Sequence, residues 1–337
     1  MKKTLAVLIA CVAISLAAKS AAEKPTLRFL QDIPLPGLKN GDFDHFAVDL
    51  GGKRLFLTGE ANNVVLVLDT NSNKLIHTIS DVEEPHSMLF LPASKQLWVV
   101  AGGEGKIKIL NSDTYEVIDI LNVDEGADSS AYDSAAHRFY VITGGGDAKL
   151  DYSLIRVFNT DSRKQVGEIK IDSKNIEAIA LEKNGPRIFA NIRDKNVVGV
   201  VDRGKATLTA TWALGELHGN TPIAYDDTTR RLFVVGRKPA SMVVLDSETG
   251  KIVATLPTAE MTDDMTFDPA SKRIYVACTD FTVVYVERDA DHYEELARIP
   301  TGFRAKTAAL VPQLKRFYVA APAHDTNVAA VKVYEVQ

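Results

Sequence analysis

Apolar and polar residues alternate in short runs along most of the chain, and the runs recur at a nearly constant interval. Each copy has a basic or polar residue, an apolar residue and an aromatic residue, followed by further alternation, as in Arg54-Leu55-Phe56. Alternation with a period of two residues is typical of strands that bury one face. The aromatic positions of the seven copies are Phe56, Trp98, Tyr140, Phe189, Phe233, Tyr275 and Tyr318.

Each copy contains the signals of four strands. A short apolar run comes first, as at 88–91, and a polar turn leads from it into the aromatic strand. A loop rich in Gly or polar residues follows, as at 101–105, then a third strand that ends near Asp or Asn, as at 106–111, and a fourth, as at 251–256. Four strands in about 40–45 residues are the layout of a β-propeller blade. A helical solenoid would need a periodicity of 3.6 residues, which the sequence does not sustain over a useful length.

The seventh copy stops after its third strand, at residues 328–336. Residues 26–33 precede the first copy and have the pattern of a lone strand. We predict that this strand pairs with the last blade and closes the ring, which leaves no long open edge. The chain from 23 to 337 is then one all-β domain, a seven-bladed β-propeller, and the extra residues at 144–152 form a loop insertion in the third blade.

The most regular copies are Arg273-Ile274-Tyr275-Val276-Ala277 and the shorter Tyr318-Val319-Ala320. These repeats resemble those of the YVTN-type seven-bladed β-propellers, the YncE-like family of bacterial exported proteins. The resemblance covers nearly the whole chain after residue 22. It implies the propeller fold and a protein that binds a ligand or a partner, but it implies no reaction.

The repeat also predicts which residues meet at the central channel, because the innermost strand of every blade starts at a similar distance from the aromatic position. The longer turn at 184–186 leaves the alignment of the fourth blade open by one residue. One residue per blade forms a ring at the channel, and the residue directly after each of these forms a second set, which includes His45 and Asp264. The residues twelve positions before the first aromatic, and their equivalents, are Asp44, His86, Asp128, Glu177, Thr221, Asp263 and Lys306.

Imidazole and carboxylate groups in one ring favour a divalent metal ion, whose identity these ligand types leave open. The alternative is a hydrated acidic channel in which the histidines bind backbone groups. The expected cofactor is therefore a divalent metal ion. Its candidate ligands are Asp44, His45, His86, Asp128, Glu177 and His218, the last from the loop that enters the fifth blade.

The loops that leave the second strands open on the same face and add further charged groups. Arg193 and Arg237 come from adjacent blades, and paired guanidinium groups suit planar anions because they donate in a fixed fork. The alternative is that both arginines make ordinary surface ion pairs. The candidate ligand-binding residues are Glu60, Arg193, Arg237, Asp263, Lys306 and His324.

The first residues predict export. Lys2 and Lys3 precede an apolar run at 4–18 and small residues at 20–22, the layout of a signal peptide at 1–22. We therefore expect a periplasmic or secreted bacterial protein with no membrane span after cleavage, although an uncleaved anchor is the alternative. Cys278 would be the only cysteine left, so that an intramolecular disulfide is excluded.

The net charge and the absence of two catalytic motifs reduce the range of possible functions. The net charge of the 337 residues is −5, which gives no reason to expect binding to nucleic acid. The sequence has no Gly-x-Ser-x-Gly and no His-Glu-x-x-His motif. We expect an exported, non-catalytic monomer that binds a small ligand, a metal ion or a protein partner at its channel face. The alternative is a metal-dependent enzyme with its site in the channel, such as a lactonase-like hydrolase or a lyase.

Overall fold

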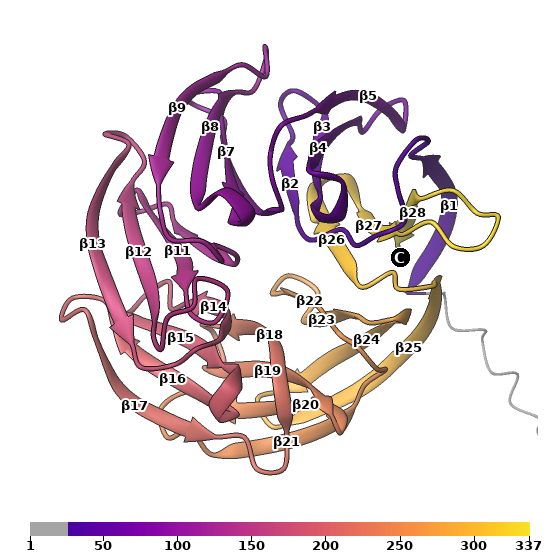
Figure 1. Cartoon of the computed structure of the whole chain (residues 1–337). Coiled ribbons are helices and arrows are strands. Elements are labelled where there is room, and N and C mark those ends of the chain that lie inside the picture. Colours follow the sequence, from indigo (N-terminus) through magenta and orange to yellow (C-terminus); the bar gives the residue numbers. More distant parts are fainter. Residues whose placement is uncertain (1–25) are drawn as a thin grey trace, which may run out of the picture.

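The computed structural model describes residues 26–337, and the predicted signal peptide lies outside the described residues. Within them the strands form seven antiparallel four-stranded sheets arranged in a ring (Figure 1). The prediction of an all-β, seven-bladed propeller is confirmed. We number the blades 1 to 7 in the order of their innermost strands along the chain.

Four strand positions and four short 3-10 helices make up the blades. The innermost strands are β2 (Phe46–Asp49), β6 (Pro85–Leu91), β10 (Ser130–Asp133), β14 (Ile176–Leu181), β18 (His218–Asp226), β22 (Asp264–Asp268) and β26 (Thr307–Val311). The second strands are β3 (Arg54–Gly59), β7 (Gln96–Ala101), β11 (Arg138–Gly144), β15 (Arg187–Ile192), β19 (Arg231–Lys238), β23 (Arg273–Ala277) and β27 (Arg316–Ala321). The third strands are β4 (Val64–Asp69), β8 (Lys106–Asn111), β12 (Ser153–Asn159), β16 (Val197–Asp202), β20 (Ala240–Asp246), β24 (Asp280–Asp289) and β28 (Ala330–Val336). The outermost strands are β5 (Lys74–Ile79), β9 (Val117–Asn122), β13 (Lys164–Ile171), β17 (Thr207–Ala213), β21 (Ile252–Pro257), β25 (His292–Gly302) and β1 (Leu27–Pro34). The 3-10 helices are η1 (Glu60–Asn62), η2 (Gly102–Glu104), η3 (Arg193–Lys195) and η4 (Pro312–Leu314).

Blade 7 contains both ends of the described chain. The strand β1 runs antiparallel to β28, with Leu27 opposite Val336 and Pro34 opposite Ala330. The side chains of Leu27 and Ile33 are buried, so that β1 contributes to the core as well as to the sheet. Figure 1 shows the indigo strand β1 beside the yellow strand β28. The predicted closure of the ring by the N-terminal strand is confirmed.

The hydrophobic core consists of seven apolar layers, each between two neighbouring blades. The seven recurring aromatic side chains are all buried in these layers. Trp98 of blade 2 meets Phe139 of blade 3 edge to face, with 5.8 Å between ring centroids. Phe233 of blade 5 meets Phe267 of blade 6 at 5.3 Å. The repeat therefore encodes packing between blades, as predicted, rather than a platform for a ligand.

The basic residue of the repeat explains how blades are held at fixed spacing. Arg54 starts β3, forms an ion pair of 2.6 Å with Asp49 across the turn, and donates to the backbone oxygen of Ser112 in blade 2. Arg187 does the same in blade 4, where it pairs with Glu182 and donates to the backbone oxygen of Ser247 in blade 5. The basic and aromatic positions of the repeat thus both serve contacts between neighbouring blades.

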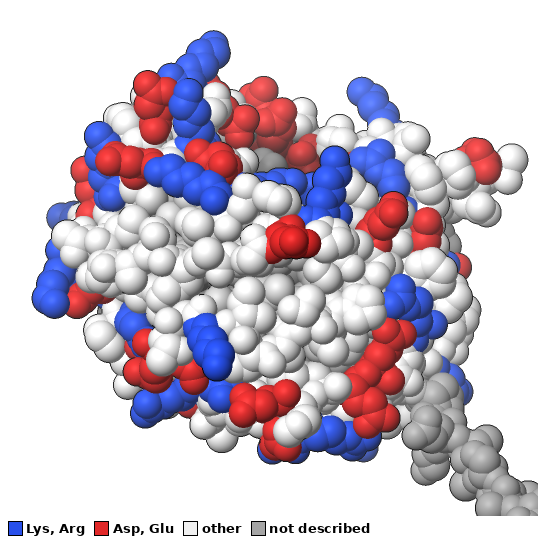
Figure 2. All heavy atoms as spheres, turned by 90° about the horizontal axis from the view of Figure 1, so that it is seen from below, with Lys and Arg blue, Asp and Glu red and all other residues white. Residues whose placement is uncertain are grey.

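The outer wall of blades 4 and 5 is largely uncharged. Figure 2 views the molecule from below Figure 1, on the side where β17 and β21 lie, and shows most charged side chains towards the two rims, with a broad band of few charges between them. Neither β17 nor β21 contains a charged residue. Within residues 26–337, no helix is both long enough and apolar enough to cross a membrane.

Candidate functional site

One cavity of about 210 Å³ is lined by residues from all seven blades. Because the loop before each innermost strand faces the axis of the ring, equivalent residues converge there. All seven positions derived from the repeat register are among the lining residues, including Glu177 of the fourth blade. The lining residues are Asp44, His45, Glu60, His86, Asp128, Ser129, Glu177, Ala178, Thr221, Arg237, Asp263 and Lys306.

Hydrogen bonds between blades fix the strand ends that carry these side chains. Thr307 at the start of β26 donates its hydroxyl to the backbone oxygen of Phe43, 2.8 Å away in the loop before blade 1. Ser87 of blade 2 donates to the backbone oxygen of Asp128 before blade 3. Both hydroxyls are buried, so their bonds are protected from water. The ring positions are therefore held by a rigid frame rather than by free loops.

Asp44, His45 and Asp128 form the candidate metal centre. One ligand atom from each of the three lies within 4.8 Å of the ligand atoms of the other two. The Nε2 atom of His45 is 3.6 Å from Oδ1 of Asp44. Two ligands of one transition-metal ion, each at about 2.1 Å from it, lie about 3–4 Å apart. Asp44 and His45 therefore have the spacing that a single divalent ion requires, and a ligand atom of Asp128 lies within 4.8 Å of both.

Asp264 stands behind His45. Its Oδ1 atom is 3.3 Å from Nδ1 of His45, the ring nitrogen that does not face Asp44. The other oxygen of Asp264 accepts the backbone N–H of Ala308 at 2.9 Å. A carboxylate on the second nitrogen is what orients most metal-binding imidazoles and fixes their tautomer. Asp264 belongs to the second set of the repeat register, but sequence reasoning did not select it as a site residue.

His86 approaches Asp44 from the other side. Its Nδ1 atom lies 2.7 Å from Oδ2 of Asp44 and 3.7 Å from Oδ1 of Asp128. The opposite edge of the imidazole packs on η2, where a Cβ added to Gly102 would lie only 2.7 Å from Cδ2 of His86. Gly102 therefore leaves the space that this ring orientation needs. The two imidazoles contact the two oxygens of one carboxylate, so they can serve one site.

The carboxyl groups of this cluster differ in pKa because their charged neighbours differ. Burial opposes ionisation of Asp44, but the charge of His45 and the hydrogen bond from His86 outweigh it and lower the pKa of Asp44 to about 2. Burial and the charge of Asp44 raise the pKa of Asp128 to about 7. Burial is likewise outweighed at His86, where Asp44 and Asp128 raise the imidazole pKa to about 9. The pKa of His45 is also raised, against the effect of burial, by Asp44 and Asp264. Without a cation, the proton on His86 offsets part of the acidic charge.

The opposite wall of the cavity is an ion-pair chain. Asp263 pairs with Lys306 at 2.7 Å and with Arg237 at 2.9 Å. Lys306 also lies 3.5 Å from Asp42, which receives a further hydrogen bond from Arg304. Neither Asp42 nor Arg304 was selected as a site residue from the sequence, although Asp42 stands two positions before Asp44 in the same stretch.

Glu177 forms an ion pair of 2.6 Å with Arg193, which begins η3 of the same blade. Its carboxylate is thus engaged by a guanidinium, in contrast to that of Asp128. Glu60 lines the cavity, and burial together with the charge of Asp44 raises its pKa. The acidic side of the cavity therefore has one group held by arginine, Glu177, and a cluster around Asp44 that is balanced by imidazoles.

The structure places two further candidate residues outside the ring. His218 is the first residue of β18, opposite Lys238 of β19, and it lines an adjoining cavity with Arg193 and Arg237. His324 stacks on Phe303 at 3.8 Å between ring centroids and lines a third cavity, in blade 7. Of the twelve candidates, nine line the channel cavity, Arg193 borders it through Glu177, and these two histidines do not reach it.

Comparison with protein-family models and with curated protein sequences gives no match. Among solved structures the chain is similar to one of the hydrazine synthase of Kuenenia stuttgartiensis, with a TM-score of 0.73 and 16% identity over 88% of this chain and 98% of that one. It is also similar to a chain in a structure of the mitotic checkpoint complex, with a TM-score of 0.75 and 16% identity over 99% of both chains. At this identity the likeness concerns the propeller fold alone.

Proposed function

We propose that this chain is an exported propeller of the YVTN, YncE-like type that binds a divalent cation in its channel and takes up a small ligand there without transforming it. The observation that carries the proposal is the convergence of Asp44, His45 and Asp128 from blades 1 and 3, with Asp264 on the far nitrogen of His45. A hydrated acidic channel would not need an imidazole oriented in this way.

Charge supports the same function. Asp44, Asp128 and Glu60 face one small cavity, and burial alone disfavours their ionised forms. A divalent cation would offset this charge directly and would bind Nε2 of His45 in place of a proton, while Nδ1 keeps its proton for Asp264. Three protein ligands leave further coordination positions open towards the cavity. Its volume of about 210 Å³ has room for a group of a few atoms beside the ion.

The test is cation binding by the mature protein purified without chelator. We expect one divalent ion per chain by elemental analysis, or saturable uptake of Zn²⁺ or Mn²⁺ by the stripped protein in calorimetry. The variant His45→Ala and the double variant His45→Ala, His86→Ala should fold normally and lose affinity by about a hundredfold or more, because ligand and orienting groups are removed. His137→Ala is the matched control, since His137 pairs with Asp161 at an exposed turn.

A protein that carries no metal and gains no thermal stability from any divalent ion would disprove the cation site. Equal affinity in wild type and His45→Ala would place a bound ion elsewhere. In either case the ring would be an acidic channel whose charge is balanced by protons and ion pairs.

One observation favours a second candidate, the metal-dependent enzyme. A site with three protein ligands and an open position is also the arrangement of catalytic zinc centres. The assay is hydrolysis of a panel of lactones by the cation-loaded protein. Turnover that disappears in His45→Ala but persists in His137→Ala would establish the enzyme, whereas cation binding without turnover leaves the binding protein.

A further inference from the structure

A second cavity, of about 510 Å³, adjoins the channel cavity between blades 4, 5 and 6. Arg237 lines both cavities, so that the two adjoin at this residue. The other lining residues of this second cavity, which we call the basic cavity, are Arg193, His218, Gly219, Lys238, Glu260 and Met261. Three permanent positive charges thus face one carboxylate, that of Glu260.

The cations of the basic cavity are incompletely neutralised. Lys238 and His218 form no ion pair with any residue in the range 26–337. Arg193 uses Nη1 for Glu177, and Arg237 uses Nη2 for Asp263 and Nε for the backbone oxygen of Thr262. Each guanidinium therefore keeps donors that no side chain of the described part occupies. Guanidinium donors in a fixed fork are the groups that recognise carboxylate and phosphate.

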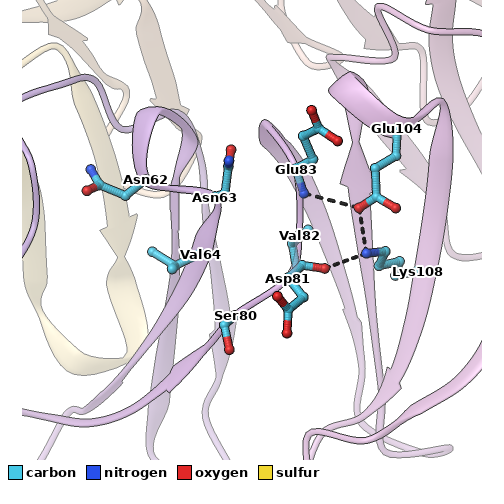
Figure 3. Close-up of a pocket in the computed structure, with 9 residues that line it drawn as sticks. All are labelled: Asn62, Asn63, Val64, Ser80, Asp81, Val82, Glu83, Glu104 and Lys108. Carbon is cyan, nitrogen blue, oxygen red and sulfur yellow. Dashed lines mark hydrogen bonds and ion pairs between the residues drawn. The ribbon is translucent and has the colours of Figure 1, made fainter.

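The other large cavities differ in this respect. Figure 3 shows the cavity between blades 1 and 2, where Lys108 binds Glu104 and the backbone oxygen of Asp81. In the cavity of blade 7, Lys332 is paired with Asp32. Their basic groups are already engaged by acidic or carbonyl oxygens. Among these sites, only the basic cavity, within residues 26–337, has a lysine and a histidine that form no ion pair.

We propose that the ligand of the channel face is a small organic anion, a carboxylate or a phosphate ester, whose anionic group binds in the basic cavity. The proposal rests on the proposed function, because it names the ligand class of that face. Arg193, Arg237 and Lys238 bind the anionic oxygens, and His218 adds a hydrogen bond. Met261, which is 45% exposed at the cavity wall, contacts the hydrocarbon part. The shared position of Arg237 brings this ligand next to the cation.

The test is calorimetric titration of the mature protein, cation-free and cation-loaded, with benzoate, phenyl phosphate and inorganic phosphate. Benzamide serves as the uncharged analogue of benzoate. We expect both organic anions to bind at least about tenfold more tightly than benzamide, because charge-assisted hydrogen bonds are lost with the neutral group. The double variant Lys238→Ala, His218→Ala should lose about tenfold or more in anion affinity and keep its cation affinity. Lys251→Ala is the control, since Lys251 is an exposed lysine at the turn between β20 and β21.

The outcomes separate the two proposals. Binding of anions no tighter than benzamide, in a protein that does bind the cation, overturns the anion site and leaves the cation site standing. Anion affinity that survives Lys238→Ala, His218→Ala but disappears in His45→Ala overturns the basic cavity, because the anion then binds the channel ion alone. Anion binding that depends on Lys238 and His218 in a protein without any cation affinity supports the basic cavity and overturns the cation site. Binding of inorganic phosphate as tight as that of phenyl phosphate overturns the assignment of an organic ligand.

Discussion

Asp264 of blade 6 lies 3.3 Å from the Nδ1 atom of His45 in blade 1, although blade 7 stands between these two blades in the ring. The contact is possible because both side chains extend from strand starts towards the axis, where the blades are closest together. Ala308 of blade 7 donates its backbone N–H to the same carboxylate. One side chain thus joins three blades beside the candidate metal centre.

The first prediction concerns this contact. Asp264→Asn should lower cation affinity by about 10- to 100-fold in calorimetry, because the amide no longer orients His45 as a carboxylate does. The circular dichroism spectrum and the elution volume should not change. Asp268→Asn, at the other end of β22, is the matched control and should bind the cation as the wild type does. Wild-type affinity in Asp264→Asn would show that Asp264 does not position the imidazole.

The second prediction concerns ring closure. Removal of residues up to 34 deletes β1, which leaves the edge of β28 unpaired and takes the buried side chains of Leu27 and Ile33 out of the core. We expect aggregation on purification, or a fall of about 10 °C or more in melting temperature. Arg28→Ala removes only an exposed ion pair with Glu335 and should change the melting temperature little. An unchanged melting temperature of the deletion variant would contradict the closure scheme.

The third prediction concerns packing between blades. Phe233 is fully buried between Phe267 and Tyr293, so Phe233→Ala should lower the free energy of unfolding by about 3–5 kcal/mol. Urea denaturation measures this difference. Phe29 is 50% exposed on β1, and Phe29→Ala should cost less than about 1 kcal/mol. Equal losses in the two variants would mean that burial between blades does not determine the contribution of the aromatic residue.

The fourth prediction concerns stability in acid. Burial works against ionisation of Glu104, but hydrogen bonds from Lys108 and Lys106 and from the backbone of Glu83 outweigh it and lower the pKa of Glu104 to about 2. Figure 3 shows the contacts of Glu104 with Lys108 and with the backbone of Glu83. Because the pKa in the folded state is below the usual value near 4.5, the stabilisation is complete above pH 4.5 and is lost as the pH falls towards 2.

Glu104→Gln should therefore be less stable than the wild type at pH 7, by about 2 kcal/mol, and the difference should shrink steadily below pH 4.5. Urea denaturation between pH 2.5 and pH 7 measures it. Glu116→Gln, at an exposed turn of the same blade, is the control. A difference between Glu104→Gln and the wild type that does not vary with pH would contradict the assigned role of the two lysines.

The fold was predictable from the sequence because seven copies of the repeat carry the same pattern of strands. Arg54 and Phe56 show why: the basic residue binds the next blade and the aromatic residue packs against it. The aromatic residue recurs at all seven junctions, and the contact of the basic residue recurs at Arg187, Arg231 and Arg273. The ring positions followed from the same register, since the residue twelve positions before the aromatic residue lines the channel cavity in every blade. Glu177 occupies its expected place despite the longer turn of blade 4.

The pairing within the site was not predictable in this way. The repeat register gives the blade of a residue and its position along the channel axis. Which side chains pair depends on the direction in which each one points across the axis, as for Asp264 and His45. The positions of His218 and His324 outside the ring have local structural causes. β18 begins early and shifts register between Asn220 and Ile223, which leaves His218 outside the ring. The loop after β27 forms an isolated bridge between His324 and Asn327, which keeps His324 beside Phe303.

The meeting of the two chain ends in blade 7 determines the order in which the molecule can be assembled. Arg28 and Glu335 are 307 positions apart, so a chain made from its N-terminus carries β1 without a partner until β28 has been made. Until β28 has formed, the apolar layers on both sides of blade 7 are also incomplete. Contacts between such distant segments form slowly. The ring is thus expected to close last, and to be most prone to association with other chains just before it does.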